Sequence, residues 1–237
     1  LFMLKKGSIV SYKKNPAVII EAGEKFTLEY PQFPAKRDGK ITYTTQSVRS
    51  KDVIFLHEGP VSSVKNIAEL AFNNPETHKT ISAIEECWEL LVSDESTQNE
   101  TLSIQDLSEL STGSYDAIQS FHLYNLLTTL PFFSQLSVED QKLPLFVPVS
   151  PEKVAIIRAK ESEKEGEARK KQEFIERLKK KNIDPSIDNQ FMQEIEALAL
   201  GKPDKSKFLK EAGFSETPES AHLILLQTKY WPLYKNP

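Results

Sequence analysis

The sequence predicts an α+β fold, and three observations carry this prediction. Short alternating or apolar segments separated by turn residues fill the first 60 positions. Between 80 and 148 the expected order is helix, helix, glycine turn, helix and hairpin, as in a winged helix. From 150 onward the pattern is helical, with Pro and Gly at the helix ends. We therefore expect a small β-barrel at 1–60, a winged-helix-like domain at 61–150, a charged bridging helix at 151–182 and a helical segment at 183–237.

The first part carries the pattern of a small all-β domain. Turn signals such as Asn15-Pro16 and Asp38-Gly39 separate its apolar segments. Five short strands at this spacing are typical of an SH3-like or an OB-like barrel, and the pattern does not separate the two. The expected strands are 8–13, 17–21, 25–30, 40–45 and 53–57.

The middle part predicts helices in a defined order. A helix from about residue 80 has Ile84 and Trp88 at helical spacing. Ser103 begins a capping box for the next helix, and Gly113 suits the turn after it. A third helix is expected at about 115–130. A hairpin is expected to follow, with strands at 132–134 and 143–147.

The last part is predicted to be helical throughout. The apolar stripe of the helix at 151–182 lapses in its middle, so we expect a solvated helix and not a coiled coil. Capping, Pro and Gly residues delimit three further helices, starting at Asp184, Asp204 and Thr217 and ending at Gly201, Gly213 and Trp231.

The net charge of −4 conceals an uneven distribution of charge along the chain. Residues 1–60 carry ten Lys and Arg against six Asp and Glu, whereas residues 80–141 carry eleven acidic residues and no Lys or Arg. From 142 onward there are eighteen basic and fifteen acidic residues. Within the charged helix, residues 158–181 hold ten basic and six acidic residues; we favour a solvated face there over an RNA-channel wall.

No pattern of catalytic or metal-ligating residues is found. The four histidines are isolated, and no phosphate loop, nucleophile elbow or paired-cysteine spacing occurs. Cys87 shares a helical face with Trp88 and is expected to be a buried, inert thiol. A single cysteine and the lack of a signal peptide or membrane span favour a reducing, cytoplasmic location without membrane contact. We expect no catalytic residue, metal or cofactor in this chain.

Nucleic-acid binding is favoured at the basic barrel. Cations among aromatic residues on a small barrel can hold phosphates and stack bases. In the alternative interpretation the aromatic rings are core residues and the lysines only increase solubility. The candidate binding residues are Tyr12, Lys13, Lys14, Lys36, Arg37, Lys40, Arg49 and Lys51.

The winged-helix pattern, by contrast, is not expected to read duplex DNA. Such reading needs Arg or Lys on phosphates and bases, and the segment 80–141 has none. The side chains expected to be exposed on its third helix are Gln119, Ser120, His122, Asn125, Thr128 and Thr129.

Several strings resemble exoribonucleases of the ribonuclease II (RNB) family, most of all the bacterial and plastid subgroup with a winged helix in place of cold-shock domains. They are KGSIVSYK from Lys6, VIFLHEGP from Val53, IEECWELL from Ile84, TLSIQDLSELST from Thr101 and AHLILLQTKYW from Ala221.

The resemblance implies a processive 3′→5′ exoribonuclease that uses Mg²⁺ at an aspartate cluster. That cluster would follow soon after Trp231 and is not in this sequence. We therefore expect an N-terminal region that binds single-stranded RNA, selects substrates and contacts a catalytic domain absent from this chain. The alternative is a non-enzymatic nucleic-acid or protein interaction module associated with transcription or translation.

Overall fold

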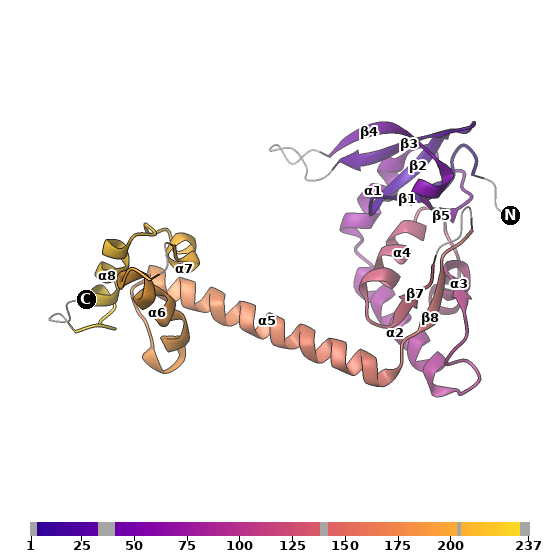
Figure 1. The fold of residues 1–237 in the computed structure, drawn as a ribbon. Coiled ribbons are helices and arrows are strands. Elements are labelled where there is room, and N and C mark those ends of the chain that lie inside the picture. Colours follow the sequence, from indigo (N-terminus) through magenta and orange to yellow (C-terminus); the bar gives the residue numbers. More distant parts are fainter. Residues whose placement is uncertain (1–3, 33–40, 138–141, 203–204, 233–237) are drawn as a thin grey trace. The chain divides into compact units, whose positions relative to one another are not determined.

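The structure is a computed structural model that describes residues 4–32, 41–137, 142–202 and 205–232. It contains helices and two antiparallel sheets, which confirms the predicted α+β class (Figure 1). The chain divides into two compact units, Leu1–Arg158 and Ala159–Pro237, and each is described by itself. The division into four segments stays a prediction.

A five-stranded antiparallel sheet opens the first unit, in the order β4-β3-β2-β1-β5. Strands β1 to β4 pair consecutively, and β5 returns to the free edge of β1. This connectivity favours the SH3-like interpretation over the Greek key of an OB fold. The strands are β1 (Ile9–Tyr12), β2 (Asn15–Glu21), β3 (Phe26–Gln32), β4 (Thr42–Val48) and β5 (Ile54–His57), with the 3-10 helix η1 (Ser50–Asp52) before β5.

The sheet is buried on both faces, because its central strands carry apolar runs. Successive side chains of a strand point to opposite faces. Val10 and Ile19 point into the core of the barrel, with Phe55. Ile9 and Val18, which face each other across β1 and β2, pack into a second core that continues into the winged helix. The sheet and the helices after it therefore share one hydrophobic core.

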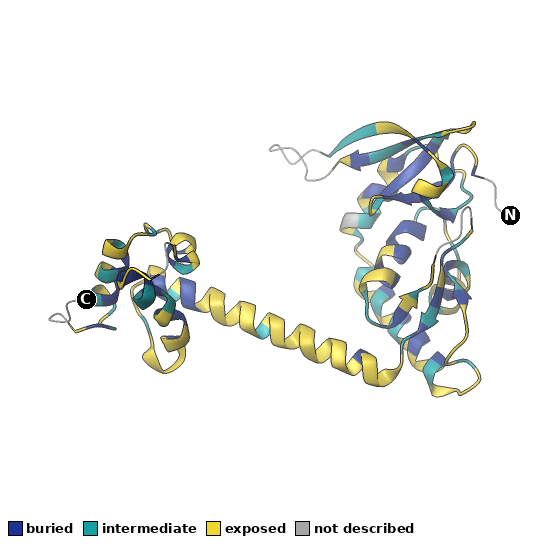
Figure 2. Cartoon of the chain, viewed as in Figure 1, coloured by how far each residue is buried: buried dark blue, intermediate teal, exposed yellow. Residues whose placement is uncertain are grey.

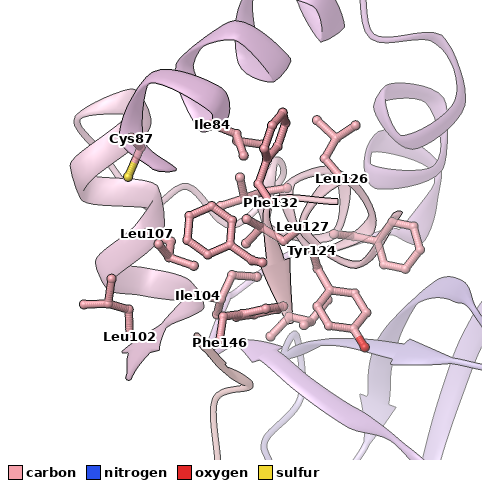
Figure 3. Close-up of a cluster of buried hydrophobic side chains, with 14 of the residues drawn as sticks. Ile84, Cys87, Leu102, Ile104, Leu107, Tyr124, Leu126, Leu127, Phe132 and Phe146 are labelled. Atoms are coloured by element: carbon pink, nitrogen blue, oxygen red, sulfur yellow. The ribbon is translucent and has the colours of Figure 1, made fainter. Parts of the chain in front are cut away.

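The middle of the first unit has the element order and strand order, β6-β8-β7, of a winged helix. The Ser103 hydroxyl accepts from the Asp106 amide (3.2 Å), and Gly113 ends the helix at φ +83°, both as predicted. Aromatic and aliphatic side chains fill the space between the helices and the small sheet (Figure 3). The elements are α2 (Thr77–Ser93), β6 (Leu102–Ser103), α3 (Ile104–Thr112), α4 (Ser120–Thr129), β7 (Phe133–Gln135) and β8 (Leu145–Pro148).

The first unit contains one helix that was not predicted and one helix that starts later than predicted. Helix α1 (Val64–Asn73) was not predicted; its cap is Ser63, whose hydroxyl accepts from the Lys65 amide. Helix α4 begins at Ser120 and not near 115. Before it, the Asp116 carboxylate accepts from two backbone amides in a turn, and the Tyr115 hydroxyl donates to the Leu56 carbonyl of β5. A tertiary contact with the barrel thus delays the start of the helix.

The second unit contains the later turns of α5 (Pro151–Lys179) and the helices α6 (Pro185–Ala199), α7 (Lys207–Glu211) and α8 (Pro218–Gln227). Asp184 and Thr217 cap α6 and α8 as predicted. Ser206 caps α7, so the predicted start at Asp204, which lies outside the described residues, was wrong. Residues 155–173 of α5 are exposed apart from Gly166, in agreement with a solvated helix (Figure 2).

Each unit has a buried tryptophan in its core. The Trp88 indole donates to the Val149 carbonyl at 2.7 Å in the first unit. The Trp231 indole donates to the Glu196 carboxylate at 2.6 Å in the second. Phe174, at the end of α5, is fully buried against these second-unit helices.

Candidate nucleic-acid interface

The tip of the β1–β2 hairpin presents two adjacent lysines. Tyr12 pairs with Asn15, so Lys13 and Lys14 are the two central residues of the turn. Both are exposed and both have positive φ, 48° and 63°. Tight two-residue hairpins of this kind favour Asn and Gly, because other L-residues lose about 1–2 kcal/mol each in the left-handed region. The turn therefore presents two cations to solvent on a strained backbone.

Tyr12 supports the first of these lysines and does not face solvent. Its ring is buried in the barrel core and meets Tyr30 edge-on, with centroids 5.2 Å apart. The Lys13 ammonium lies 5.0 Å from the Tyr12 ring centroid. A hydrogen bond to Tyr12 is the main cause that raises the pKa of Lys13, so this lysine stays charged. Tyr12 therefore positions a cation, and its ring is not available to stack on a base.

The remaining candidates have different surroundings. Arg49 is exposed and forms an ion pair with Asp52 (3.6 Å) across η1, and Lys51 is exposed in the same turn. Ser11 pairs with Ile54, so η1 precedes the part of β5 that lies beside the end of β1. The structure thus associates Tyr12 with the two turn lysines and brings η1 toward the same end of the sheet. Lys36, Arg37 and Lys40 lie outside the described residues.

Sequence analysis missed one cation at this domain. Lys65 on α1 lies with its ammonium 5.7 Å from the ring centroid of Tyr43, a β4 residue. Pro31, not Tyr30, pairs with Tyr43, so Tyr43 and Tyr30 point to opposite faces of the sheet. The signal for α1 was present in the sequence: Ser63 as a cap, then Val64, Ile67 and further apolar residues at helical spacing.

Helix α4, the second helix of the helix-turn-helix, is almost enclosed. Ser120 and His122 were predicted to be exposed and are buried. They are buried because α4 contacts β1, β5 and α1 on one side and α2 and α3 on another. Asn125 and the two threonines that end the helix remain exposed. A helix that reads the major groove must be accessible along its length.

Beside α4 lies a cavity of about 240 Å³ between α2, α3 and α4, which includes His122. Burial lowers the pKa of His122, so the ring is held neutral. The Ala71 carbonyl is near enough to oppose this shift, but neither ring nitrogen has a partner in hydrogen-bond geometry. We assign no ligand to this cavity.

The described residues offer neither a metal site nor a reactive thiol. Within the described ranges, no three His, Cys, Asp or Glu side chains form a group that could hold a metal ion. Cys87 is buried as predicted, and burial raises the pKa of its thiol, which keeps it protonated. Among the helices described, none is long and apolar enough to cross a membrane.

Replacing Lys13-Lys14 with Asn-Gly is expected to stabilise the first unit by about 1 kcal/mol, because Asn-Gly suits a turn with two positive φ angles. The same change removes two exposed cations from the hairpin tip. Urea unfolding followed by Trp88 fluorescence, with Trp231 replaced by Phe, measures the effect on stability. A loss of stability would mean that the lysines form contacts that hold the turn.

Comparison with protein families gives a match over the last part of the chain. Residues 154–237 match the HTH_RNase_II model, described as a double HTH domain. The match includes α6, α7 and α8 of the second unit and most of α5. Searches of the curated proteins and of the solved structures gave no match. The segment 154–237 is therefore supported as a ribonuclease II-related helix-turn-helix region.

Proposed function

We propose that this chain binds single-stranded RNA at the hairpin end of the barrel and selects substrates for a ribonuclease II-type 3′→5′ exoribonuclease. The observation that carries the proposal is the pair of exposed lysines, Lys13 and Lys14, held at positive φ. The family match at 154–237 supports the link to ribonuclease II. The Mg²⁺-dependent chemistry would belong to a catalytic domain of that family and not to residues described here.

Electrostatics and accessibility favour a single strand as the ligand. Lysine ammonium groups bind phosphates without regard to sequence, and they release counterions when they do so. Duplex reading by the winged helix is disfavoured, because α4 is enclosed and the segment 80–141 has no Lys or Arg. The half-buried Tyr30, beside Tyr12, is the ring at this end most able to meet an unpaired base.

Changing Lys13 and Lys14 to Gln is expected to flatten the salt dependence of RNA binding. Each lost phosphate contact reduces the slope of log affinity against log salt by about 0.7 for single strands, or about 1.4 for the pair. The measurement is fluorescence anisotropy with a labelled single-stranded RNA between 50 and 200 mM salt, a range of about fourfold.

The control removes the same charge elsewhere in the first unit: Lys25, between β2 and β3, and Lys79 on α2, both exposed, are changed to Gln. An equal loss of slope in both variants would contradict binding at the hairpin tip. The link to exoribonuclease action is tested separately. The chain is fused to a ribonuclease II-type catalytic domain, and laddering from the RNA 3′ end is compared with and without the two lysines.

A further inference from the structure

A second surface of the chain has the properties of an anion site. Helices α5 and α6 border a groove of about 690 Å³ within the second unit. The α5 wall is charged and the α6 wall is mostly neutral and polar. The groove residues used in the argument are Arg169, Lys170, Glu173, Arg177, Asn189 and Gln190.

The groove is lined by three basic residues, Arg169, Lys170 and Arg177, and one acidic residue, Glu173, and these belong to a basic stretch of α5. From Arg169 to Lys181 the sequence holds seven basic and two acidic residues, and six of the seven are exposed. Helix α6 and its N-cap carry four acidic residues, but each of their carboxylates already accepts a hydrogen bond from within the second unit. The four acids accept hydrogen bonds as follows: Asp184 from Ser186, Asp188 from Arg177, Glu194 from Ser206 and Glu196 from Trp231.

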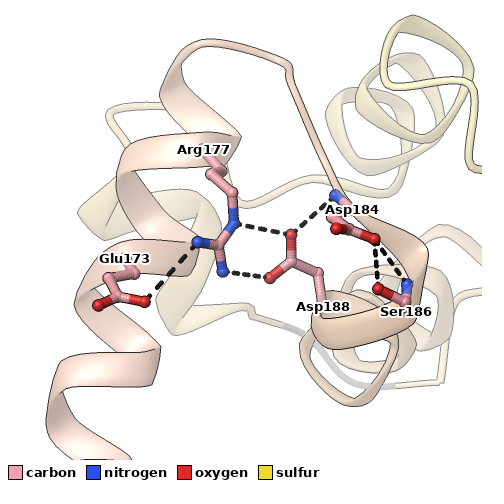
Figure 4. A network of polar contacts seen from close by, with 5 residues as sticks. All are labelled: Glu173, Arg177, Asp184, Ser186 and Asp188. Carbon is pink, nitrogen blue, oxygen red and sulfur yellow. Dashed lines mark hydrogen bonds and ion pairs between the residues drawn. The ribbon is translucent and has the colours of Figure 1, made fainter.

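Arg177 is fixed in the floor of this groove by a fully buried carboxylate. Its Nε donates to one oxygen of Asp188 at 3.0 Å and its Nη2 to the other at 2.6 Å (Figure 4). The backbone amide of Asp184 holds the same carboxylate at 3.0 Å. The third nitrogen, Nη1, makes no such bond and points toward Glu173. The guanidinium is therefore pre-oriented, with one donor group left over.

Glu173 occupies the position where an anionic ligand would be held. Its carboxylate lies 3.8 Å from Arg177 Nη1 and 3.9 Å from Arg169 Nε, between two guanidinium groups. Both distances exceed those of a good charge-assisted hydrogen bond. The Glu173 side chain is 55% exposed, so it is free to leave. Exposed pairs of this kind contribute little to stability.

We infer that this groove binds the sugar–phosphate backbone of single-stranded RNA, with one phosphate replacing the Glu173 carboxylate between Arg169 and Arg177. The inference rests on the proposed RNA ligand but concerns a different surface from the hairpin tip. Guanidinium groups match phosphate geometry, and Lys170 adds a further cation.

The neutral wall offers RNA contacts in addition to those with phosphate. Asn189, whose Oδ1 accepts from the Tyr230 hydroxyl, keeps its amide donors, and Gln190 is exposed beside it. Side-chain amides bond both to sugars and to the edges of unpaired bases. Ile187, 55% exposed on the same wall, offers an apolar contact to a base.

The decisive variant is Glu173→Gln in the full chain, with Glu167→Gln as the control. Glu167 is an exposed acid on the same helix and is not part of the groove, so the control removes the same charge. Glu173→Gln is expected to tighten binding of a labelled oligouridine by about fivefold at low salt, because a competing anion is gone. The salt slope should not become flatter, because the same phosphate is bound in both forms.

Changing Arg169 and Lys170 to Gln should flatten the slope by about 1.4. Arg177 is not substituted, because it supports the fold. If Glu173→Gln and Glu167→Gln behave alike, the inference is overturned. It is also overturned if Glu173→Gln tightens binding of a poly-glutamate peptide and leaves the RNA affinity unchanged.

The hairpin variant separates failure of this inference from failure of the proposed function. With Lys13 and Lys14 changed to Gln, the effect of Glu173→Gln should persist, since the two surfaces lie in different units. A flattened slope from the hairpin variant without any effect of Glu173→Gln overturns the groove alone. No RNA binding by the unchanged chain overturns both.

Discussion

Replacing Gly59 with alanine is expected to unfold the first unit or to destabilise it by more than about 4 kcal/mol, the range of exceptional substitutions. An added Cβ would lie 2.1 Å from the carbonyl oxygen of Gly7. That carbonyl accepts from the Val61 amide, and the Gly7 amide donates to Ile19 of β2. The clash is with backbone that joins three segments, so it cannot be relieved by a side-chain rotation.

Gly113→Ala is the matched control. Gly113 has nearly the same φ (+83° against +79°), but a Cβ there would meet nothing within 4 Å. Its cost should be only the left-handed strain of about 1–2 kcal/mol. Urea unfolding of both variants, followed by Trp88 fluorescence in a Trp231→Phe background, gives the comparison. Equal losses of unfolding free energy in the two variants would show that the backbone near Gly7 can move to accommodate the added Cβ, contrary to the expectation.

Asp188→Ala should strongly destabilise the second unit. The carboxylate is completely buried and accepts from the Arg177 guanidinium and the Asp184 amide. Removing one partner of a buried ion pair costs about 3–5 kcal/mol, because the other charge is left uncompensated. Arg177 retains some exposure to water, so we expect a loss near 3 kcal/mol, the lower end of that range.

A double-mutant cycle tests this explanation of the Asp188 effect. Arg177→Met removes the stranded cation, so combining it with Asp188→Ala should cost clearly less than the sum of the single changes. Unfolding is followed by Trp231 fluorescence in a Trp88→Phe background. Additive losses would show that the pair is not coupled and that Asp188 acts only by holding the backbone at Asp184.

Local signals in the sequence predicted local structure well. The capping box at Ser103 and the glycine at 113 depend on neighbouring residues, and both were found where expected. The wrong predictions arose from contacts between distant segments. Ser120 and His122 appear exposed in a helix considered alone, and only the packing of α4 against the barrel and α1 buries them.

Contacts between distant segments also limited what the sequence could predict about the candidate site. The cations Lys13 and Lys14 were visible in the sequence, but their positive φ and the burial of Tyr12 depend on the register of β1 and β2. Arg169, Glu173 and Arg177 follow one another at helical spacing, which predicts salt bridges on a solvated helix. The groove needs α6 opposite them, and no pattern within α5 gives that pairing.

Both faces of the sheet in the first unit are buried, so its barrel cannot simply be moved alone to another protein. Ile9, Val18 and Leu56 are covered by the helices that follow the sheet. A barrel grafted onto another protein without those helices would expose all three, at about 1.5–3 kcal/mol for each side chain. It would also offer an apolar surface for self-association. To be portable, the hairpin tip proposed to bind RNA would have to be moved with the helices that follow the sheet, or those three positions would have to be made polar first.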